Sequence, residues 1–407
     1  MKEIKNKKSS STWLKTISLE PIIYIISLVF LAILVRLPLL PFISPDMSTC
    51  LLPWMNIIDQ NKFKSLAMNF SDYNMPYLYF MLLISYIKSI PYSTSIKFIS
   101  IIFEFLTCSF VYVLVKEKFK DRNILIPIFA FAVILFAPTV LTNGAFWGQC
   151  DIIYTFFVVA SLYYLIKDRP SLACILYGIG FSFKLQAIFV APILLLLFIK
   201  DKISLKNLLL IPLTCIAVMI PSYLAGRPFL DVINIYLNQA KSYDYALTLN
   251  APNLYQWINN GYLQYFKTPG IIVTFAIVVA SVVFLSKNIK KLTPEKIFTI
   301  ALFYSLIVPF FLPKMHERYF FMADILSIIY AFYFPKKYYL AILVSLVSLF
   351  SYMPFLNGSA SIELKYLAFV LLFVIIIVTK DLYELCANET NPTENHKILP
   401  KMNRNQV

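Results

Sequence analysis

The sequence predicts an all-α integral membrane protein with about 12–14 transmembrane helices. Of its 407 residues, 59% are hydrophobic and only 14% are charged, whereas soluble domains average about 45–50% apolar and about 25% charged residues. Long apolar runs alternate with short charged loops, without the ~10-residue alternating segments of a membrane β-barrel. Helices are therefore expected, because only helices and closed barrels satisfy the backbone in hydrocarbon.

Thirteen apolar segments are candidate spans, although several fall short of the ~20 residues that a bilayer requires. Both termini are predicted to be cytoplasmic, whereas an odd number of spans would place them on opposite sides of the membrane. Either one segment therefore does not cross, or one more span exists. The strained region is 75–116, where Pro91 separates two segments with little loop. The shortest pair, 172–184 and 186–200, is predicted to form half-length or broken helices. The candidate spans are 21–41, 75–91, 96–115, 123–141, 152–166, 172–184, 186–200, 208–225, 270–286, 297–313, 320–335, 338–356 and 366–382.

The basic residues indicate which loops face the cytoplasm. The net charge is +15, and the positive residues concentrate in the N-terminus and in short loops, which is typical of cytoplasmic segments. No soluble basic face exists for nucleic acid. We expect a cytoplasmic segment 1–20, a single catalytic membrane domain 21–382, whose first span is a retained anchor, and a cytoplasmic tail 383–407. The predicted cytoplasmic loops are 116–122, 167–169, 200–206, 287–296 and 336–337.

Two longer loops, 42–74 and 226–269, are predicted to lie outside the cytoplasm. The first has room for short interfacial helices. The second is rich in aromatic and amide side chains, which suit either a carbohydrate or an interfacial aromatic belt; its candidate pocket residues are Asn250, Asn253 and Tyr255. No cytoplasmic loop can hold a nucleotide-binding domain, so an activated substrate must come from the membrane or from outside.

Two predicted outer segments in the first half of the chain carry candidate site residues. Asp46 follows the first span between prolines and could act as a general base on an incoming hydroxyl, or it could be a solvated loop residue. In NGAFWGQCD, Gln149 and Asp151 are candidate pocket residues, although a helix cap is the role that physics favours for Asp151.

Two further segments carry cations at the outer membrane edge. Lys184 and Gln186 lie at the break between the two half-helices, where a lysine could meet an anion or snorkel to the interface. In LPKMHERYFF, the positive charges of Lys314 and Arg318, beside His316 and Glu317, are unusual for an outer loop. A lipid phosphate would account for them, because a guanidinium offers several donors to phosphate oxygens. A plain headgroup anchor is the alternative.

The order of these motifs resembles that of the GT-C membrane glycosyltransferases. An acidic first loop is followed by FWGQCDIIYT, KLQAIFVAP and HERYFF over about residues 36–330. The pattern is similar to bacterial proteins related to the second mannosyltransferase of GPI-anchor assembly and, more distantly, to dolichyl-phosphate-glucose glucosyltransferases. The resemblance implies an inverting hexosyl transfer from a polyprenyl-phosphate sugar to a cell-envelope glycan or glycolipid, on the non-cytoplasmic face of the cell membrane.

The resemblance also implies residue roles. Asp46 would be the base, His316 and Arg318 would contact the lipid phosphate, and Lys184 with Gln186 would line the same pocket. The sequence departs from the family motif in having KLQ in place of KQ, which shifts Gln186 by one position. No cofactor is implied with certainty, and a divalent cation paired with Asp46 is left open.

Two other functions fit the same composition. A transporter or flippase for lipid-linked sugars would show broken helices at matching positions of two repeats, and only the pair near 172–200 is found. An envelope polysaccharide polymerase would also have many spans and one large outer loop.

Overall fold

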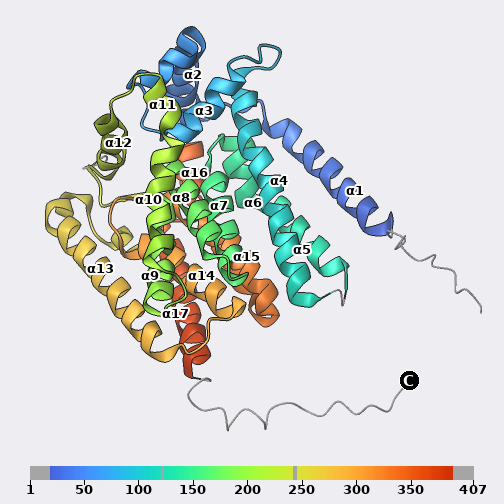
Figure 1. Cartoon of the computed structure of the whole chain (residues 1–407), viewed down its shortest axis with the longest axis vertical. Coiled ribbons are helices and arrows are strands. Elements are labelled where there is room, and N and C mark those ends of the chain that lie inside the picture. Colours follow the sequence, from blue (N-terminus) through green and yellow to red (C-terminus); the bar gives the residue numbers. More distant parts are fainter. Residues whose placement is uncertain (1–18, 121–122, 242–244, 388–407) are drawn as a thin grey trace, which may run out of the picture.

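The computed structural model describes residues 19–120, 123–241 and 245–387, and almost all of its secondary structure is helical. Figure 1 shows the helices packed as one bundle, with α1 and α13 on its outside. The helices are α1 Leu19–Arg36, α2 Leu52–Asn61, α3 Met75–Ile84, α4 Tyr92–Phe119, α5 Leu125–Leu135, α6 Pro138–Leu141, α7 Asp151–Ile166, α8 Pro170–Phe183, α9 Ala191–Ile199, α10 Leu205–Val218, α11 Ile220–Leu224, α12 Phe229–Lys241, α13 Leu263–Asn288, α14 Pro294–Phe311, α15 Phe321–Tyr333, α16 Tyr338–Asn357 and α17 Leu364–Ala387.

The helices confirm an all-α polytopic membrane protein. Within the described residues, seven helices are long and apolar enough to cross a bilayer, and a pair bent by 44°, α5 with the segment Pro138–Trp147, adds an eighth. Four shorter apolar helices accompany them. In the apolar 18-residue stretch of α14, 83% of the residues are buried inside the bundle. In the corresponding stretches of Leu19–Leu39 and Leu205–Leu224, only 11% are buried. The exposed apolar faces of the outer helices contact lipid.

The predicted span 75–91 contains a helix that is too short to cross a bilayer by itself. The helix there, α3, has 10 residues, or about 15 Å at 1.5 Å per residue, which is half of a hydrocarbon core. Figure 1 shows it beside α2 at the upper end of the molecule. Pro91 then begins α4 as its N-cap. Without this segment the predicted number of crossings is even.

Described residues of three predicted basic loops meet at one end of the bundle. Lys118, at the end of α4, lies 3.4 Å from Glu295 at the start of α14 and donates to the carbonyl of Tyr333. Lys167, after α7, pairs with Glu117 at 2.7 Å. The described parts of 42–74 and 226–269, the two loops predicted to be outer loops and called so below, lie towards the other helix ends (Figure 1). Leu19 and Glu20 begin α1 and residues 383–387 end α17; the rest of the predicted terminal segments, 1–20 and 383–407, lies outside the described residues.

The predicted broken helix is present. After α8, Lys184 is extended (φ −148°, ψ 137°), and the chain continues as the 3₁₀ turn η5, Leu185–Val190, before α9. The break places the Lys184 side chain inside the bundle, where it is buried.

The first outer loop is attached to α4 by two buried cations. At the end of α1, Arg36 forms an ion pair with Glu104 of α4 at 2.6 Å and donates to the carbonyl of Leu135. Lys97, also on α4, donates to the carbonyls of Leu39, Leu40 and Phe42 at 3.2, 3.0 and 2.7 Å. Ionised groups in the apolar interior persist only when they are paired, so these contacts specify how the chain leaves α1 towards Asp46.

A glycine allows the second outer segment to approach the first. Gly148 follows the wide turn η4, Thr142–Trp147, at φ +86°, and a Cβ there would lie 2.6 Å from the Cε atom of Met47. Met47 begins the π-helical turn η2, Met47–Leu51, directly after Asp46.

We therefore predict that Gly148→Ala lowers the thermal unfolding midpoint in detergent more than Gly358→Ala does. Both positions have a positive φ, which costs an alanine about 1–2 kcal/mol, but Gly358 has nothing within 4 Å of its Cβ direction. The Met47 side chain is fully buried, so shifting its flexible end to make room adds a further, smaller cost. Equal shifts for the two variants would contradict this packing.

Candidate active site

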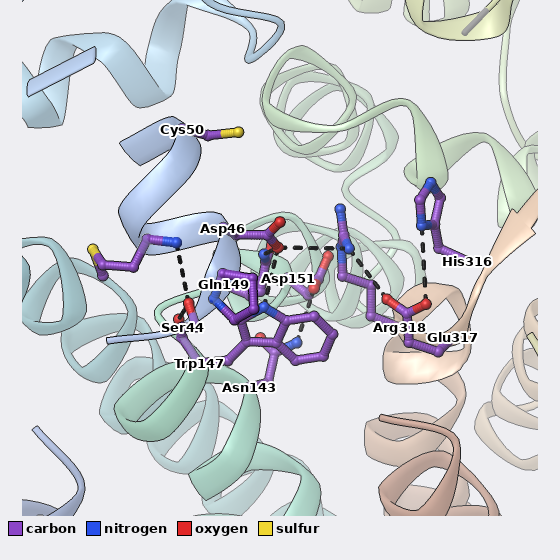
Figure 2. Close-up of polar contacts among 12 residues, drawn as sticks. Ser44, Asp46, Cys50, Asn143, Trp147, Gln149, Asp151, His316, Glu317 and Arg318 are labelled. Carbon is purple, nitrogen blue, oxygen red and sulfur yellow. Dashed lines mark hydrogen bonds and ion pairs between the residues drawn. The ribbon is translucent and has the colours of Figure 1, made fainter. Parts of the chain in front are cut away.

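Four segments that are distant in the sequence bring their polar residues together, and Figure 2 shows polar contacts among residues of this site. Asp46 comes from the loop after α1, Gln149 from the turn before α7, Lys184 from the break after α8, and Arg318 from the short turn η8, Glu317–Phe320, after α14. Each lies next to a helix end, so the helix bundle fixes the position of the loops that carry these side chains.

Asp46 is held by donors from the second segment and by a cation. Its Oδ2 accepts hydrogen bonds from Trp147 Nε1, at 3.0 Å, and from Gln149 Nε2, and it lies 3.9 Å from Arg318 Nη1. Gln149 in turn accepts a hydrogen bond from Tyr73 at 3.0 Å. Trp147, Gln149 and Arg318 all approach Oδ2 of Asp46, which leaves Oδ1 for a further ligand.

Arg318 links Asp46 to a second carboxyl group. Its Nη1 lies 3.3 Å from Glu317 Oε1, and its guanidinium lies over the ring of Trp147 at 5.7 Å. Its Nε is buried and has no hydrogen-bond partner among the described residues. Burial raises the pKa of Glu317 to about 7, although Arg318 opposes the rise.

His316 is close to these charges but is itself neutral. Burial, together with the positive charges of Arg318 and Lys184, lowers the pKa of His316 to about 2. Its Nδ1 lies 3.9 Å from Glu317 Oε2, and its backbone is part of the strand β2, Met315–His316. A neutral imidazole can donate a hydrogen bond but contributes no charge to an anion site.

Asp151 binds a neighbouring cation and does not cap its helix. It is fully buried, pairs with Lys184 at 2.5 Å and accepts a hydrogen bond from Asn143 at 2.8 Å. The N-cap of α7 is Cys150, which makes no side-chain cap. The expected capping role is therefore wrong, and Asp151 instead holds the Lys184 side chain in place.

A cavity of about 330 Å³ adjoins Arg318. Its polar lining combines four cations with two amides and one carboxylate, and the rest of its wall is apolar or aromatic. Of the predicted residues, Lys184, Gln186 and Arg318 line it. The polar lining residues are Asp72, Lys184, Gln186, Gln239, Lys267, Lys314 and Arg318.

Three predicted pocket residues of the second outer loop have packing contacts instead. Asn250 forms a backbone bridge with His316, next to the parallel pairing of β1, Thr248–Leu249, with β2. Asn253 is buried and caps a 3₁₀ turn, and Tyr255 donates to the carbonyl of Phe311 at 2.8 Å. None of the three lines the cavity. They attach the loop to the segment that carries His316.

Sequence reasoning missed Asp72, Gln239 and Lys267 as cavity residues. Asp72 lies in a loop with other aspartates, and Gln239 and Lys267 lie in the aromatic loop and at its end. No local motif separates them from solvated residues, because their position depends on how the two outer loops pack.

The described residues contain no group of three or more His, Cys, Asp or Glu side chains that could hold a metal ion. The hydrogen bonds and the ion pair of Asp46 with described residues come from Trp147, Gln149 and Arg318. Donors and a cation do not suit a divalent ion, which prefers oxygen ligands.

A search against protein-family models found no match for this chain, and a search of the curated proteins found none either.

The high pKa of Glu317 predicts that anion binding at Arg318 depends on pH. Below about pH 7 Glu317 is neutral and Arg318 is available to an anion; above it the carboxylate competes for the guanidinium. The affinity for dihexyl phosphate, whose single charge does not change between pH 5 and 9, should fall by up to about tenfold as the pH rises through 7. Isothermal titration calorimetry in detergent measures this.

In Glu317→Gln the affinity should stay at its low-pH value throughout. The matched control is Glu363→Gln, since Glu363 is exposed and pairs only with Lys365 among the ion pairs of the described chain. A pH profile that Glu317→Gln leaves unchanged would show that another group titrates.

Proposed function

We propose that this protein is a membrane glycosyltransferase that moves a sugar, such as mannose or another hexose, from a polyprenyl-phosphate donor to a hydroxyl of an envelope glycan or glycolipid. The observation that carries the proposal is that the Asp46 carboxylate lies 3.9 Å from Arg318. Arg318 and three lysines line a cavity whose remaining wall is largely apolar. A base beside an anion site that also accepts apolar chains suits a lipid-linked phosphate donor.

In the proposed step, an acceptor hydroxyl oxygen forms a bond to C1 of the sugar while the bond from C1 to the phosphate oxygen breaks. The electron pair of that bond passes to the phosphate, and the hydroxyl proton passes to Asp46. Attack opposite the leaving phosphate inverts C1. Oδ1 of Asp46 takes the proton, because Trp147, Gln149 and Arg318 already approach Oδ2.

The cations have a defined part in this step. A sugar phosphodiester carries one negative charge, whereas the departing lipid phosphate monoester carries about −1.5 to −2 at neutral pH. Negative charge therefore grows on the phosphate as the bond breaks. Cations held in place beforehand stabilise the transition state more than the bound donor, which raises the rate.

The distribution of charge also supports a non-cytoplasmic active site. Lys118 and Lys167 belong to the basic loops at one end of the bundle, and the candidate site lies at the other. If the basic end faces the cytoplasm, as positive-inside bias implies, the site faces outward in the cell membrane and the donor reaches it from the outer leaflet.

The proposal predicts that purified protein consumes a sugar-bearing lipid and that Asp46→Asn strongly slows this consumption. Farnesyl phosphoryl sugars serve as donors and octyl glycosides as acceptors, with released farnesyl phosphate and glycoside product measured by mass spectrometry. Loss of a general base should reduce turnover by about 10²–10⁴-fold, while farnesyl phosphate binding is retained. A parallel comparison of envelope glycans in cells, at equal protein level, should show the same loss.

The control is Asp59→Asn, from the same loop. Asp59 pairs with Lys62 at 2.5 Å and with Lys88 and should support wild-type turnover. Unchanged turnover in Asp46→Asn would refute the role of Asp46. Movement of intact donor across vesicles without cleavage would indicate a transporter, and chains of repeat units as product would indicate a polymerase.

A further inference from the structure

The cavity beside Arg318 contains a carboxylate that an anion site alone does not explain. Asp72 belongs to the first outer loop, just before α3, and it is the one acidic residue in the lining of this cavity. Lys184 and Arg318 act on it electrostatically, and so does the like charge of Asp46. A carboxylate in such a place weakens phosphate binding by repulsion. Its presence therefore suggests that it contacts a part of the ligand other than the phosphate.

Asp72 is held in position by both outer loops. Gln239 of α12 donates to the backbone carbonyl of Asp72 at 2.5 Å and to Asn74 Oδ1 at 3.2 Å. Asn74 donates to the carbonyl of Phe183, the residue before Lys184, at 3.3 Å. The Asp72 backbone is therefore attached to α12 and to the end of α8, while its side chain is accessible from the cavity.

The lining holds a second acceptor, the side-chain amide oxygen of Gln186. Gln186 Oε1 is buried and has no hydrogen-bond partner among the described residues. A buried acceptor without a donor costs free energy unless a ligand supplies one. Together, Asp72 and Gln186 offer acceptors to a group rich in donors. Sugar hydroxyls are such groups, and each can donate to a carboxylate or an amide oxygen.

We propose that Asp72, with Gln186, binds hydroxyl groups of the donor's sugar and determines which sugar the cavity accepts, while Lys184, Lys314 and Arg318 bind the phosphate. This proposal rests on the proposed glycosyltransferase function. It assigns the two carboxylates separate tasks. Asp46, outside the cavity lining, takes the acceptor proton, and Asp72, inside it, recognises the donor sugar.

The proposal predicts that one substitution affects two probes differently. Asp72→Asn should weaken the binding of farnesyl phosphoryl-mannose or farnesyl phosphoryl-glucose, whichever the wild type binds more tightly, by about ten- to a hundredfold, because hydrogen bonds to a charged group are lost. Farnesyl phosphate, which has no sugar, should bind equally well or more tightly, because a negative charge is removed. Calorimetric titration of purified protein measures both affinities.

Lys314→Met is the matched control from the same lining, and it should weaken both probes together. Asp72→Glu tests the specificity itself and should change the ratio of the mannosyl to the glucosyl affinity. Asp72→Asn and wild type should share one thermal unfolding midpoint, since the side chain is accessible.

Equal weakening of both probes by Asp72→Asn, or no change in either, would overturn the role of Asp72 and leave the proposed transferase function intact. Failure of the wild type to bind any of the three probes would instead overturn the transferase function, and the sugar-binding role with it.

Discussion

The site depends on keeping an ionised carboxylate and a guanidinium 3.9 Å apart at the edge of an apolar bundle. Neither Asp46 nor Arg318 can be placed there without partners, because desolvated charges that lack hydrogen bonds are costly. Trp147 and Gln149 donate to the carboxylate, and Glu317 lies beside the guanidinium. The surrounding polar residues are therefore needed for the pair to exist, whatever ligand the cavity accepts.

The buried polar contacts of the bundle lie directly behind this pair. Arg36 with Glu104 and Lys97 with its three carbonyls attach the first loop to α4. Asp151 holds Lys184 at the helix break. The pairing of β1 with β2 attaches the second outer loop to the segment of His316. Each ligand-facing segment thus has a rigid support inside the bundle, while outer helices such as α1 and α10 present apolar faces to lipid.

The charges of the site are arranged around a cavity of mixed character. Apolar walls suit a lipid chain, and the cations suit its phosphate. His316 is neutral and Glu317 titrates near pH 7, so the positive charge available to a ligand comes from lysines and Arg318. One acidic residue in the lining, Asp72, differs from this pattern, and the proposed sugar-binding role of Asp72 rests on this difference in charge.

The sequence by itself determined the membrane class, the broken helix at Lys184 and the segments that meet at the site, including those of Asp46 and Arg318. Hydropathy, charge bias and local motifs are properties of neighbouring residues, so they can be read without a fold. The tertiary structure alone decided that the helix within 75–91 has only 10 residues, that Asp151 binds Lys184, that Asn253 and Tyr255 pack against α14, and that Asp72 lines the cavity. These features depend on contacts between segments that are far apart in the chain. The residues next to a polar loop residue do not indicate which distant segment it will contact.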